Sequence, residues 1–560
     1  MAKPKSVIFI MFKNNGIQYH CAKINKMMKL KSIQIFIFGF FSFTTSLNAQ
    51  WDYRVEIEPM GLDNLPSLHS YVFAQLEDQY LVIGGRKDGI HPRQPWAAFD
   101  EANKNTMAYV IDVKNKQVYS ASLSSLQTDI YEQLSSSNMN FHQEGDTLYI
   151  IGGYGYSGTA QDHITYPYLT TINVKETIDA IVNQQDVSGF ISQIKHDSLA
   201  VTGGHLAHHE GTFYLVGGHR FVGRYNPMGH NTYTQQYTHE VRTFTIDNSG
   251  ANPVINNYAS IHNEDHLRRR DYNLVPQIFE DGEFGFLISS GVFQKDVDLP
   301  FLYPVQVRKD KIVAVTDFNQ YLSNYHSASV GLYDKQNKKM HSLFFGGLSQ
   351  YDLENEKLIK DDQVPFVKTI SLLTQSENGT YEEFKLGTSM PKLMGGGAEF
   401  FINQEIDQIQ HEIIDINSFT EDSITIGYIF GGIESNSANP FTDNTPQETK
   451  ANSVMYEVRL IVDKQSSINY IQKVPGIKIY PNPVKTGKIH IETPFKEEIH
   501  RVLLLDQTGK VLQDVNQPTK TKDFTYVTEI SKDIPSQMLY LHMISETGQT
   551  FKNKVIWMNE

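Results

Sequence analysis

The chain has 560 residues, of which 40% are hydrophobic and 12% aromatic, and its formal net charge is −14. A chain of this length can form more than one hydrophobic core, so more than one domain is expected. Its acidic balance argues against binding to nucleic acid or to an anionic membrane surface. The single cysteine is Cys21, so the remaining chain can form no intramolecular disulfide, thiolate metal cluster or cysteine nucleophile.

The N-terminal region contains a pattern typical of a secretory signal peptide. A basic stretch at Met28–Lys31 is followed by an apolar run from Ile33 to Leu47 and by Ala49 before Gln50. The run of about 15 residues is shorter than the roughly 20 that a membrane-spanning helix needs. We therefore predict that residues 1–49 are an N-terminal extension and signal peptide, cleaved near Ala49, and that the mature chain has no transmembrane segment. Met1, Met27 and Met28 remain alternative starts.

The middle of the chain contains a repeat in which a short apolar strand ends in two glycines. Five copies and one degraded copy, Phe286–Gly291, follow one another at intervals of 57 to 85 residues, and each interval has room for about four strands. A strand that leaves a crowded sheet needs positive φ or close backbone contact, and glycine allows both. The paired glycines are Gly84, Gly85, Gly152, Gly153, Gly217, Gly218, Gly346, Gly347, Gly431 and Gly432.

The repeat resembles the kelch family, whose propeller blades carry a double glycine at the end of the second strand. The resemblance covers about residues 50–465, although these units are longer than the roughly 50-residue kelch repeat and keep the family's Tyr and Trp positions poorly. It implies an all-β fold with a six-bladed kelch-like β-propeller. The strand Trp51–Ile57 is expected to complete the last blade beside Ser453–Ile461, because this pairing would remove an open sheet edge.

A second module follows a polar linker at residues 466–473. Residues 474–560 alternate short apolar strands with turns, which predicts a small C-terminal β-sandwich. Its motifs resemble the type A sorting domain of the Bacteroidetes type IX secretion system, although Leu539 replaces a usual glycine. The motif residues are Tyr480, Pro481, Asn482, Pro483 and the turn residue Gly509. The resemblance implies the type IX machinery as a partner and a secreted or outer-membrane surface-attached protein; an ordinary accessory sandwich is the alternative.

The segments that follow the double glycines are rich in aromatic, Arg and His residues. Equivalent connections of a propeller emerge on the same face, so these segments should be neighbours. Aromatic faces beside Arg and His donors suit a sugar or peptide ligand, whereas small aromatic cores within long loops are the alternative. The predicted ligand-binding residues are Arg86, His91, Trp96, Tyr154, His219, Arg220 and Tyr225.

Other polar clusters support no site as clearly. His208 and His209 are adjacent, so on a strand they would face opposite ways and could not share an ion. The Arg268–Asp271 run forms either an anion pocket at the rim or a solvated turn. Acidic residues between Gln404 and Asp422 are explained by solvation of an insertion. No metal site, cofactor or catalytic residue is predicted.

Two classes of function remain open. We favour a secreted or cell-surface propeller that binds carbohydrate or protein ligands, without nucleic acid as a partner. The alternative is a sugar-processing enzyme resembling the kelch-type sialic acid mutarotases, since a shared fold does not define a site. Copper radical oxidases similar to galactose oxidase are excluded because they need a Tyr–Cys crosslink, and the chain beyond Cys21 has no cysteine.

Overall fold

The computed structural model describes residues 7–13, 16–22, 51–228, 232–410, 412–462, 471–495, 497–522 and 524–559. The predicted apolar run, the cleavage position at Ala49, Met27, Met28 and most of the linker lie outside these ranges. Residues 1–50 and 51–560 form separate units. In the first unit, β1 (Val7–Lys13) and β2 (Gly16–Ala22) form an antiparallel hairpin. No helix in the described ranges is long and apolar enough to cross a bilayer.

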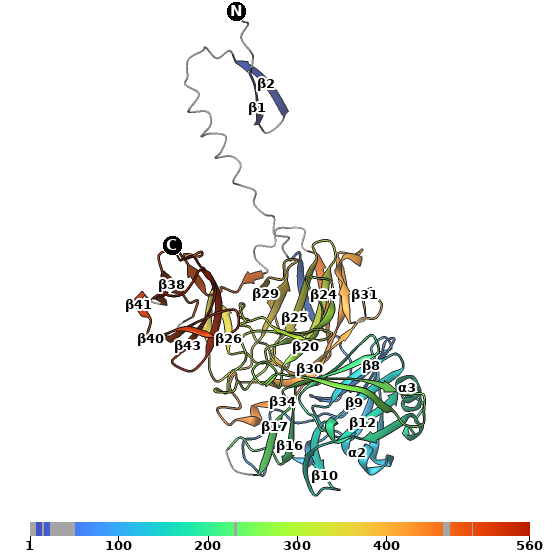
Figure 1. The fold of residues 1–560 in the computed structure, drawn as a ribbon. Helices are drawn as coiled ribbons and strands as arrows, with labels where there is room; N and C mark the ends of the chain where they lie inside the picture. The colour runs from blue at the N-terminus through green and yellow to red at the C-terminus, as the bar shows by residue number, and fades with distance from the viewer. Residues whose placement is uncertain are drawn as a thin grey trace, which may run out of the picture. The chain divides into compact units, whose positions relative to one another are not determined.

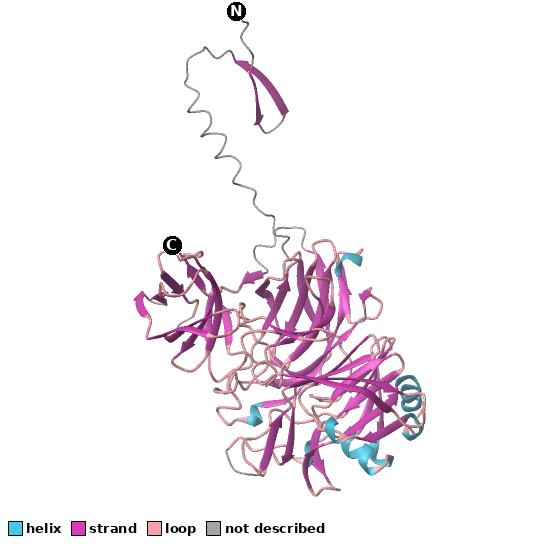
Figure 2. Cartoon of the chain, viewed as in Figure 1, coloured by secondary structure: helices cyan, strands magenta, loops and turns pink. Residues whose placement is uncertain are grey.

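The second unit is an all-β fold made of several sheets whose strands are mostly antiparallel (Figures 1 and 2). Within the described residues, sheets one to three each hold four strands. The residues at the start of the first strand of each repeat form what we call its lead-in segment: 69–70, 137–138, 202–205, 268–273, 325–327 and 396–397. Sheet one contains β4 (Val72–Leu76), β5 (Gln79–Ile83), β6 (Met107–Asp112) and β7 (Gln117–Ser122). Sheet two contains β8 (Asn140–Glu144), β9 (Thr147–Ile151), β12 (Tyr168–Asn173) and β13 (Ile191–Lys195). Sheet three contains β14 (His205–His209), β15 (Thr212–Val216), β18 (Glu240–Asp247) and β19 (Val254–His262).

Sheet four also holds four strands, whereas sheets five and six have additional ones. Sheet four contains β20 (Asn273–Ile278), β21 (Phe284–Ser289), β22 (Val305–Val307) and β23 (Ile312–Ala314). Sheet five contains β24 (Ala328–Asp334), β25 (Lys339–Phe345), β28 (Thr369–Gln375) and β29 (Tyr381–Ser389), extended by β31 (Gln408–Ile409), β32 (Ile413–Asp415) and β36 (Ile471–Lys473). Sheet six contains β30 (Leu393–Ile402), β33 (Ser423–Ser435), β35 (Tyr456–Val462) and β3 (Tyr53–Pro59), with β34 (Thr449–Ala451) beside β33.

The N-terminal strand of this unit completes the last sheet. β3 pairs antiparallel with β35, and Tyr53 lies opposite Val462. The pairing expected from the sequence is therefore confirmed. Since β3 supplies the outermost strand, the edge of β35 is covered.

The six sheets pack in a closed cycle. Side chains alternate between the two faces of a strand, so each sheet contributes to two apolar clusters. Val72 and Ala74 pack with sheet two, whereas Tyr71 and Tyr80 pack with Phe401 and Phe430 of sheet six. Further clusters join sheets two and three, three and four, four and five, and five and six. The core therefore lies between neighbouring sheets around the whole cycle.

Hydrogen bonds join the lead-in segments of the six sheets in the same cycle. Asn138 N donates to Ser70 O (3.1 Å), Gly203 N to Asn138 O (3.2 Å), Ser327 N to Asn273 Oδ1 (3.0 Å), Gly397 N to His326 O (2.7 Å) and Ser70 N to Gly397 O (2.9 Å). The remaining link places His205 Nε2 at 2.9 Å from Tyr272 O. The lead-in segments therefore meet at the centre of the cycle.

The double glycines have the geometry expected of them. All ten have positive φ, and in the degraded copy Ser290 (57°) and Gly291 (89°) take the same conformation. At Gly152, where φ is 71°, an added Cβ would overlap the Val201 carbonyl oxygen at the start of the next repeat. Glycine is required there by both the dihedral angle and the close approach.

The connections within and between the sheets form smaller elements. β10 (Tyr154–Ser157), β11 (Asp162–Thr165), β16 (His219–Gly223) and β17 (Tyr233–Tyr237) make one four-stranded sheet from two different repeats, and β26 (Tyr351–Glu354) pairs with β27 (Lys357–Lys360). The α-helices of the described residues are α2 (Thr128–Leu134) and α3 (Val174–Val182). The 3-10 turns are Glu101–Asn103, Leu123–Ser125, Ser188–Phe190, Asp197–Leu199, Ile416–Ser418 and Pro446–Glu448.

The C-terminal module consists of two facing four-stranded sheets. The first contains β37 (Lys478–Tyr480), β38 (Lys488–Glu492), β42 (Thr525–Glu529) and β41 (Thr519–Lys522), and the second β40 (Val511–Asn516), β39 (Ile499–Leu505), β43 (Gln537–Ser545) and β44 (Thr550–Trp557). Their shared core includes Val502, Leu541 and Trp557, and Leu539 is fully buried within it. Tyr321 and Tyr351, which belong to the same unit, pack against Phe495 of this core.

Residues of the segment Tyr480–Val484 are hydrogen-bonded to the last strand of this module. Asn482 Oδ1 accepts a hydrogen bond from Ile556 N (2.9 Å), and Val484 N donates to Ile556 O (2.8 Å). Tyr480 stacks on His490 at 5.1 Å. In the predicted turn, Gly509 has φ 84° and its N–H donates to Asp506 O (3.0 Å).

Candidate functional site

One position in each repeat lies directly after the glycine pair and forms a β-bridge with the lead-in segment. These six residues, which we call the collar, are Arg86, Tyr154, His219, Val292, Leu348 and Ile433. Their bridge partners are His69, Ser137, Thr202, Arg270, Tyr325 and Gly396. The same backbone arrangement is therefore repeated six times around the centre of the cycle.

The collar surrounds a cavity of ≈ 610 Å³. All six collar residues line it, together with lead-in residues from every repeat. This volume falls within the range of roughly 300–1,000 Å³ that is common for small-molecule sites. The cavity is the candidate functional site.

Aromatic rings form one wall of the cavity. Phe221 and Tyr233 each lie 5.3 Å from Tyr225 between ring centroids. His91 stacks on Phe99 at 5.0 Å and meets Tyr225 edge-on at 5.2 Å. Tyr154, Phe221 and Tyr225 also form a small buried cluster of their own. The sequence left open whether these aromatic residues line a binding face or form a small core within the loops. In the structure they do both, because the core of the loops is also the wall of the cavity.

The run Arg268–Asp271 contributes two guanidinium groups to the cavity. Arg268 lies over the Tyr237 ring at 4.3 Å, and Arg270 lies over Phe293 at 4.1 Å and 3.4 Å from Asp271 Oδ2. Since residues of an extended segment alternate in direction, Arg269 between them is buried and donates to the carbonyl groups of His266 (3.0 Å), Ser290 (2.8 Å) and Tyr303 (2.8 Å). The run is therefore neither a solvated turn nor a uniform anion pocket.

Arg86 is held by an ion pair at the edge of the cavity. Its Nε and Nη2 donate to Asp88 at 2.9 and 2.6 Å, and Nη2 also donates to Asp100 O at 3.1 Å. Burial raises the pKa of Asp88, but hydrogen bonds and charges from His69 and Arg86 outweigh this effect and lower the pKa to about 2. Arg86 is thus fixed in place with its charge compensated.

Two histidines of the cavity have lowered pKa values. Burial lowers the pKa of His91 to about 4. Burial, and secondarily the charge of Arg270, lowers the pKa of His219 well below its ordinary value. His219 Nδ1 has no hydrogen-bond partner among the described residues. A buried nitrogen of this kind can be satisfied by a polar group of a ligand.

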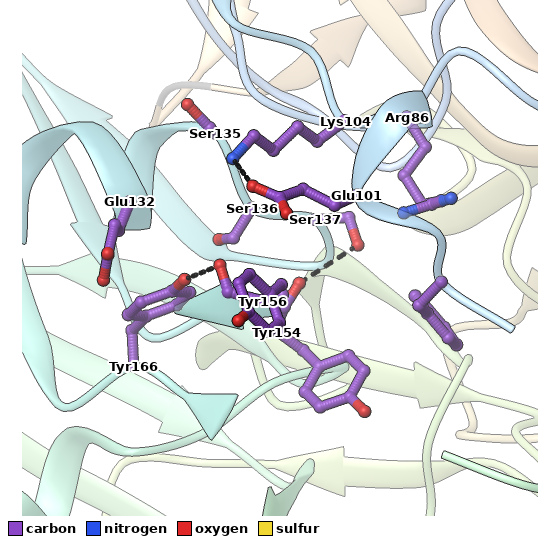
Figure 3. Close-up of a pocket in the computed structure, with 12 residues that line it drawn as sticks. Arg86, Glu101, Lys104, Glu132, Ser135, Ser136, Ser137, Tyr154, Tyr156 and Tyr166 are labelled. Carbon is purple, nitrogen blue, oxygen red and sulfur yellow. Dashed lines mark hydrogen bonds and ion pairs between the residues drawn. The ribbon is translucent and has the colours of Figure 1, made fainter. Parts of the chain in front are cut away.

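A small pocket adjoins the cavity behind Arg86 and Tyr154 (Figure 3). Its volume of ≈ 10 Å³ holds about one water molecule. Hydrogen bonds hold its wall: Glu132 accepts from Ser157 Oγ (2.6 Å) and Thr159 N (3.0 Å), and Tyr166 donates to Tyr156 O (2.9 Å). We regard it as an extension of the wall and not as a second ligand site.

The structure brings five of the seven predicted ligand residues to the cavity. Arg86, His91, Tyr154, His219 and Tyr225 line it. Trp96 and Arg220 are not among the lining residues: Trp96 is 75% exposed, and Arg220 lies exposed on β16 opposite Gln236. Both follow a glycine pair, as the five lining residues do. Position after the glycine pair therefore does not distinguish residues at the rim from residues that line the cavity.

Sequence reasoning considered the Arg268–Asp271 run but did not predict that the lead-in segments of all six repeats line one cavity. Asp271 and His326 line the cavity, and Asp271 Oδ1 lies 3.7 Å from His326 Nδ1. The signal that could have found them is their equivalent place before the first strand of each repeat. In the sequence alone these residues resemble an ordinary turn, because their β-bridge to the collar is visible only in the structure.

The neighbouring histidines of sheet three separate as expected. His208 packs beside His142, whereas His209 packs against Phe284 with ring centroids 4.2 Å apart. The prediction that they face opposite ways is confirmed. His208 belongs instead to a cluster with His142 and Glu144, outside the cavity.

Comparisons with known proteins give a limited result. No family model and no curated protein matches the chain. Among solved structures 135 chains match, and one described as "Structure of YjhT" is 13% identical with a TM-score of 0.39, covering 74% of this chain and 99% of that chain. The function assigned to the cavity therefore rests on the residues that line it.

Proposed function

We propose that this protein is a six-bladed kelch-like β-propeller whose central cavity binds a carbohydrate. The closed cycle of six sheets, each with a positive-φ pair and a collar residue, supports the propeller. The cavity carries the proposal for the ligand: flat rings such as Tyr225 suit the apolar face of a sugar, and Arg268 and Arg270 supply directional donors for its oxygen atoms.

The test is a glycan array probed with the full chain and with matched variants. Arg270→Gln and Tyr225→Ala should weaken binding at least about tenfold, because each removes a group that lines the cavity. Arg220→Ala and Trp96→Ala, outside the lining, should leave binding unchanged. Loss of binding in the second pair with retention in the first would move the site to the rim. Binding of a peptide but of no glycan would identify a protein ligand instead.

A sugar-processing activity of the mutarotase kind is the second candidate. Support comes from the unpartnered Nδ1 of His219 and from the Asp271–His326 pair, which could hold or move a proton at a bound sugar. Proton NMR of anomer exchange would detect such turnover. His219→Gln should abolish it, and Arg220→Gln should not. Exchange at the uncatalysed rate with every sugar that binds would reject the enzyme.

We further propose that the protein is exported through the type IX secretion system, to be secreted or displayed on the outer membrane. The proposal rests on the signal-peptide pattern and on the sorting motif Tyr480–Pro483. In a Bacteroidetes host, deletion of residues 474–560 should retain the protein in the periplasm. The exported protein should begin at Gln50. Equal export in a strain without the type IX machinery would overturn the proposal, and cell fractionation would distinguish attachment from release.

A further inference from the structure

A cluster of His142, Glu144 and His208 lies at the ends of β8 and β14 that are remote from the cavity. Asn138 and Gly203, which precede β8 and β14, line the cavity, whereas Glu144 ends β8 and His208 is the fourth residue of β14. Because a strand rises about 3.3 Å per residue, Glu144 lies about 13 Å beyond Asn140 along β8. The cluster is therefore separate from the cavity.

Three side chains of this cluster bring one possible ligand atom each to the same point. His142 and Glu144 are two residues apart on β8 and share a face of the strand. Each of the three offers an atom within 4.8 Å of the other two: Glu144 Oε2 lies 3.0 Å from His208 Nδ1 and 3.9 Å from His142 Nε2. A tetrahedral zinc ion needs donor atoms about 3.3 Å apart, so small side-chain rotations suffice.

The surroundings of the cluster also suit a cation. The side chains of His142 and His208 are only 10% and 12% exposed, whereas that of Glu144 is 48% exposed and gives access to solvent. Phe213 packs against His208 at 4.7 Å and against His142 at 6.4 Å.

A second carboxylate lies behind one of the histidines. Glu412, in the insertion of sheet six, places Oε1 3.7 Å from His142 Nδ1, the nitrogen opposite the one that faces Glu144. A carboxylate on the outer nitrogen of a histidine is the usual way in which proteins orient a metal ligand. Solvation alone does not account for this acidic residue, because its carboxylate is directed at His142.

We propose that His142, Glu144 and His208 bind a divalent transition-metal ion of the zinc class, with Glu412 orienting His142. Two imidazoles and one carboxylate form a nitrogen and oxygen ligand set that suits zinc, and solvent completes the coordination at the exposed side. The ion joins the ends of β8 and β14, and so stabilises the contact between sheets two and three. This site is independent of the carbohydrate proposed for the cavity.

The test is zinc titration of the full chain after treatment with EDTA and without an affinity tag. Calorimetry should show one equivalent of bound Zn²⁺, no comparable binding of Mg²⁺, and a melting temperature that rises with zinc. His208→Gln should weaken zinc binding at least about 100-fold, and Glu412→Gln roughly 10- to 100-fold. The matched control is His209→Gln, which changes the adjacent histidine and should retain zinc.

Cobalt supplies a second measurement. Co²⁺ should give the strong visible absorption of a four-coordinate site in the wild type and in His209→Gln, but not in His208→Gln. If His208→Gln does not fold, as judged by circular dichroism, Glu144→Gln decides, because it changes a half-exposed carboxylate. Absence of zinc binding in the wild type, or equal binding in a folded His208→Gln or Glu144→Gln, would overturn the proposal.

Discussion

The two halves of the collar share a backbone and differ in their side chains. Repeats one to three carry Arg86, Tyr154 and His219, whereas repeats four to six carry Val292, Leu348 and Ile433. In all six the collar residue follows a positive-φ pair and bridges to a lead-in segment. The comparison teaches that the repeat preserves backbone geometry, while the chemistry of the cavity is distributed unequally around it.

The largest effect is expected where the shared backbone is broken. Gly152→Ala should destabilise the protein by about 4 kcal/mol or more, because the new methyl group meets the Val201 carbonyl and the residue keeps a φ of 71°. Gly145→Ala is the matched control: its φ is 56° but nothing lies within 4 Å of the new Cβ, so a loss of about 1 kcal/mol is expected. Urea unfolding measures both. Similar losses would mean that the close approach contributes little.

The second-largest effect is expected on ligand binding, when a polar residue of the collar is replaced by an aliphatic one. His219→Leu introduces at this collar position the residue type of Leu348. It should lower the affinity for the glycan that the wild type binds about tenfold, or about 1.4 kcal/mol. Leu348→Met, which conserves volume on the aliphatic half, should change affinity less than about twofold. Calorimetric titration measures both. Equal losses would show that the two halves contribute alike.

The same variant should reduce sensitivity to acid. The pKa of His219 is lower in the folded protein than its ordinary value of 6.5, so between these values the unfolded chain binds more protons. The stability due to the neutral side chain is complete above about pH 6.5 and falls as the pH decreases, by up to about 1.4 kcal/mol per pH unit. His219→Leu should therefore lose less stability than wild type between pH 7 and pH 5, whereas Leu348→Met should match wild type. Melting curves at both pH values test this, and an unchanged slope in His219→Leu would contradict it.

The smallest effect is expected at the degraded glycine pair. Ser290 has φ 57°, and its buried hydroxyl has no hydrogen-bond partner among the described residues. Ser290→Gly should therefore stabilise the protein by about 1 kcal/mol or less, opposite in sign to Gly152→Ala. A loss of stability measured by urea unfolding would show that the serine hydroxyl contributes to packing of the fourth repeat.

The strands were predictable from the sequence because their signals are local. The runs Gln79–Ile83 and Ala108–Asp112 alternate β-branched and aromatic residues between polar turns, and they form β5 and β6. The pairing of β3 with β35 was predictable from the unpaired edge alone. The sheet formed by β10, β11, β16 and β17 was not, since it combines loops of two repeats whose pairing no local pattern encodes.

The candidate site was only partly predictable, because the position of a residue after a glycine pair does not specify whether its side chain points into the cavity. Tyr154 and His219 bridge to lead-in segments and reach the cavity, whereas Arg220, one residue after His219, lies on the exposed side of β16. Glu412 and His142 are far apart in the chain, and only the fold reveals that they meet. Side-chain direction and long-range contact therefore account for what the sequence did not show.

The strand β3 sets an order on folding. Tyr53 is near the start of the second unit and Val462 is close to the end of the last sheet, so the final pairing closes nearly the whole repeat region as one loop. Such a loop is costly in chain entropy, and its contacts cannot form until both ends of the region are present. During synthesis β3 therefore remains unpaired until β35 of the last sheet has been made. The outermost strand of sheet six is accordingly the first strand of this unit to be made and among the last to pair.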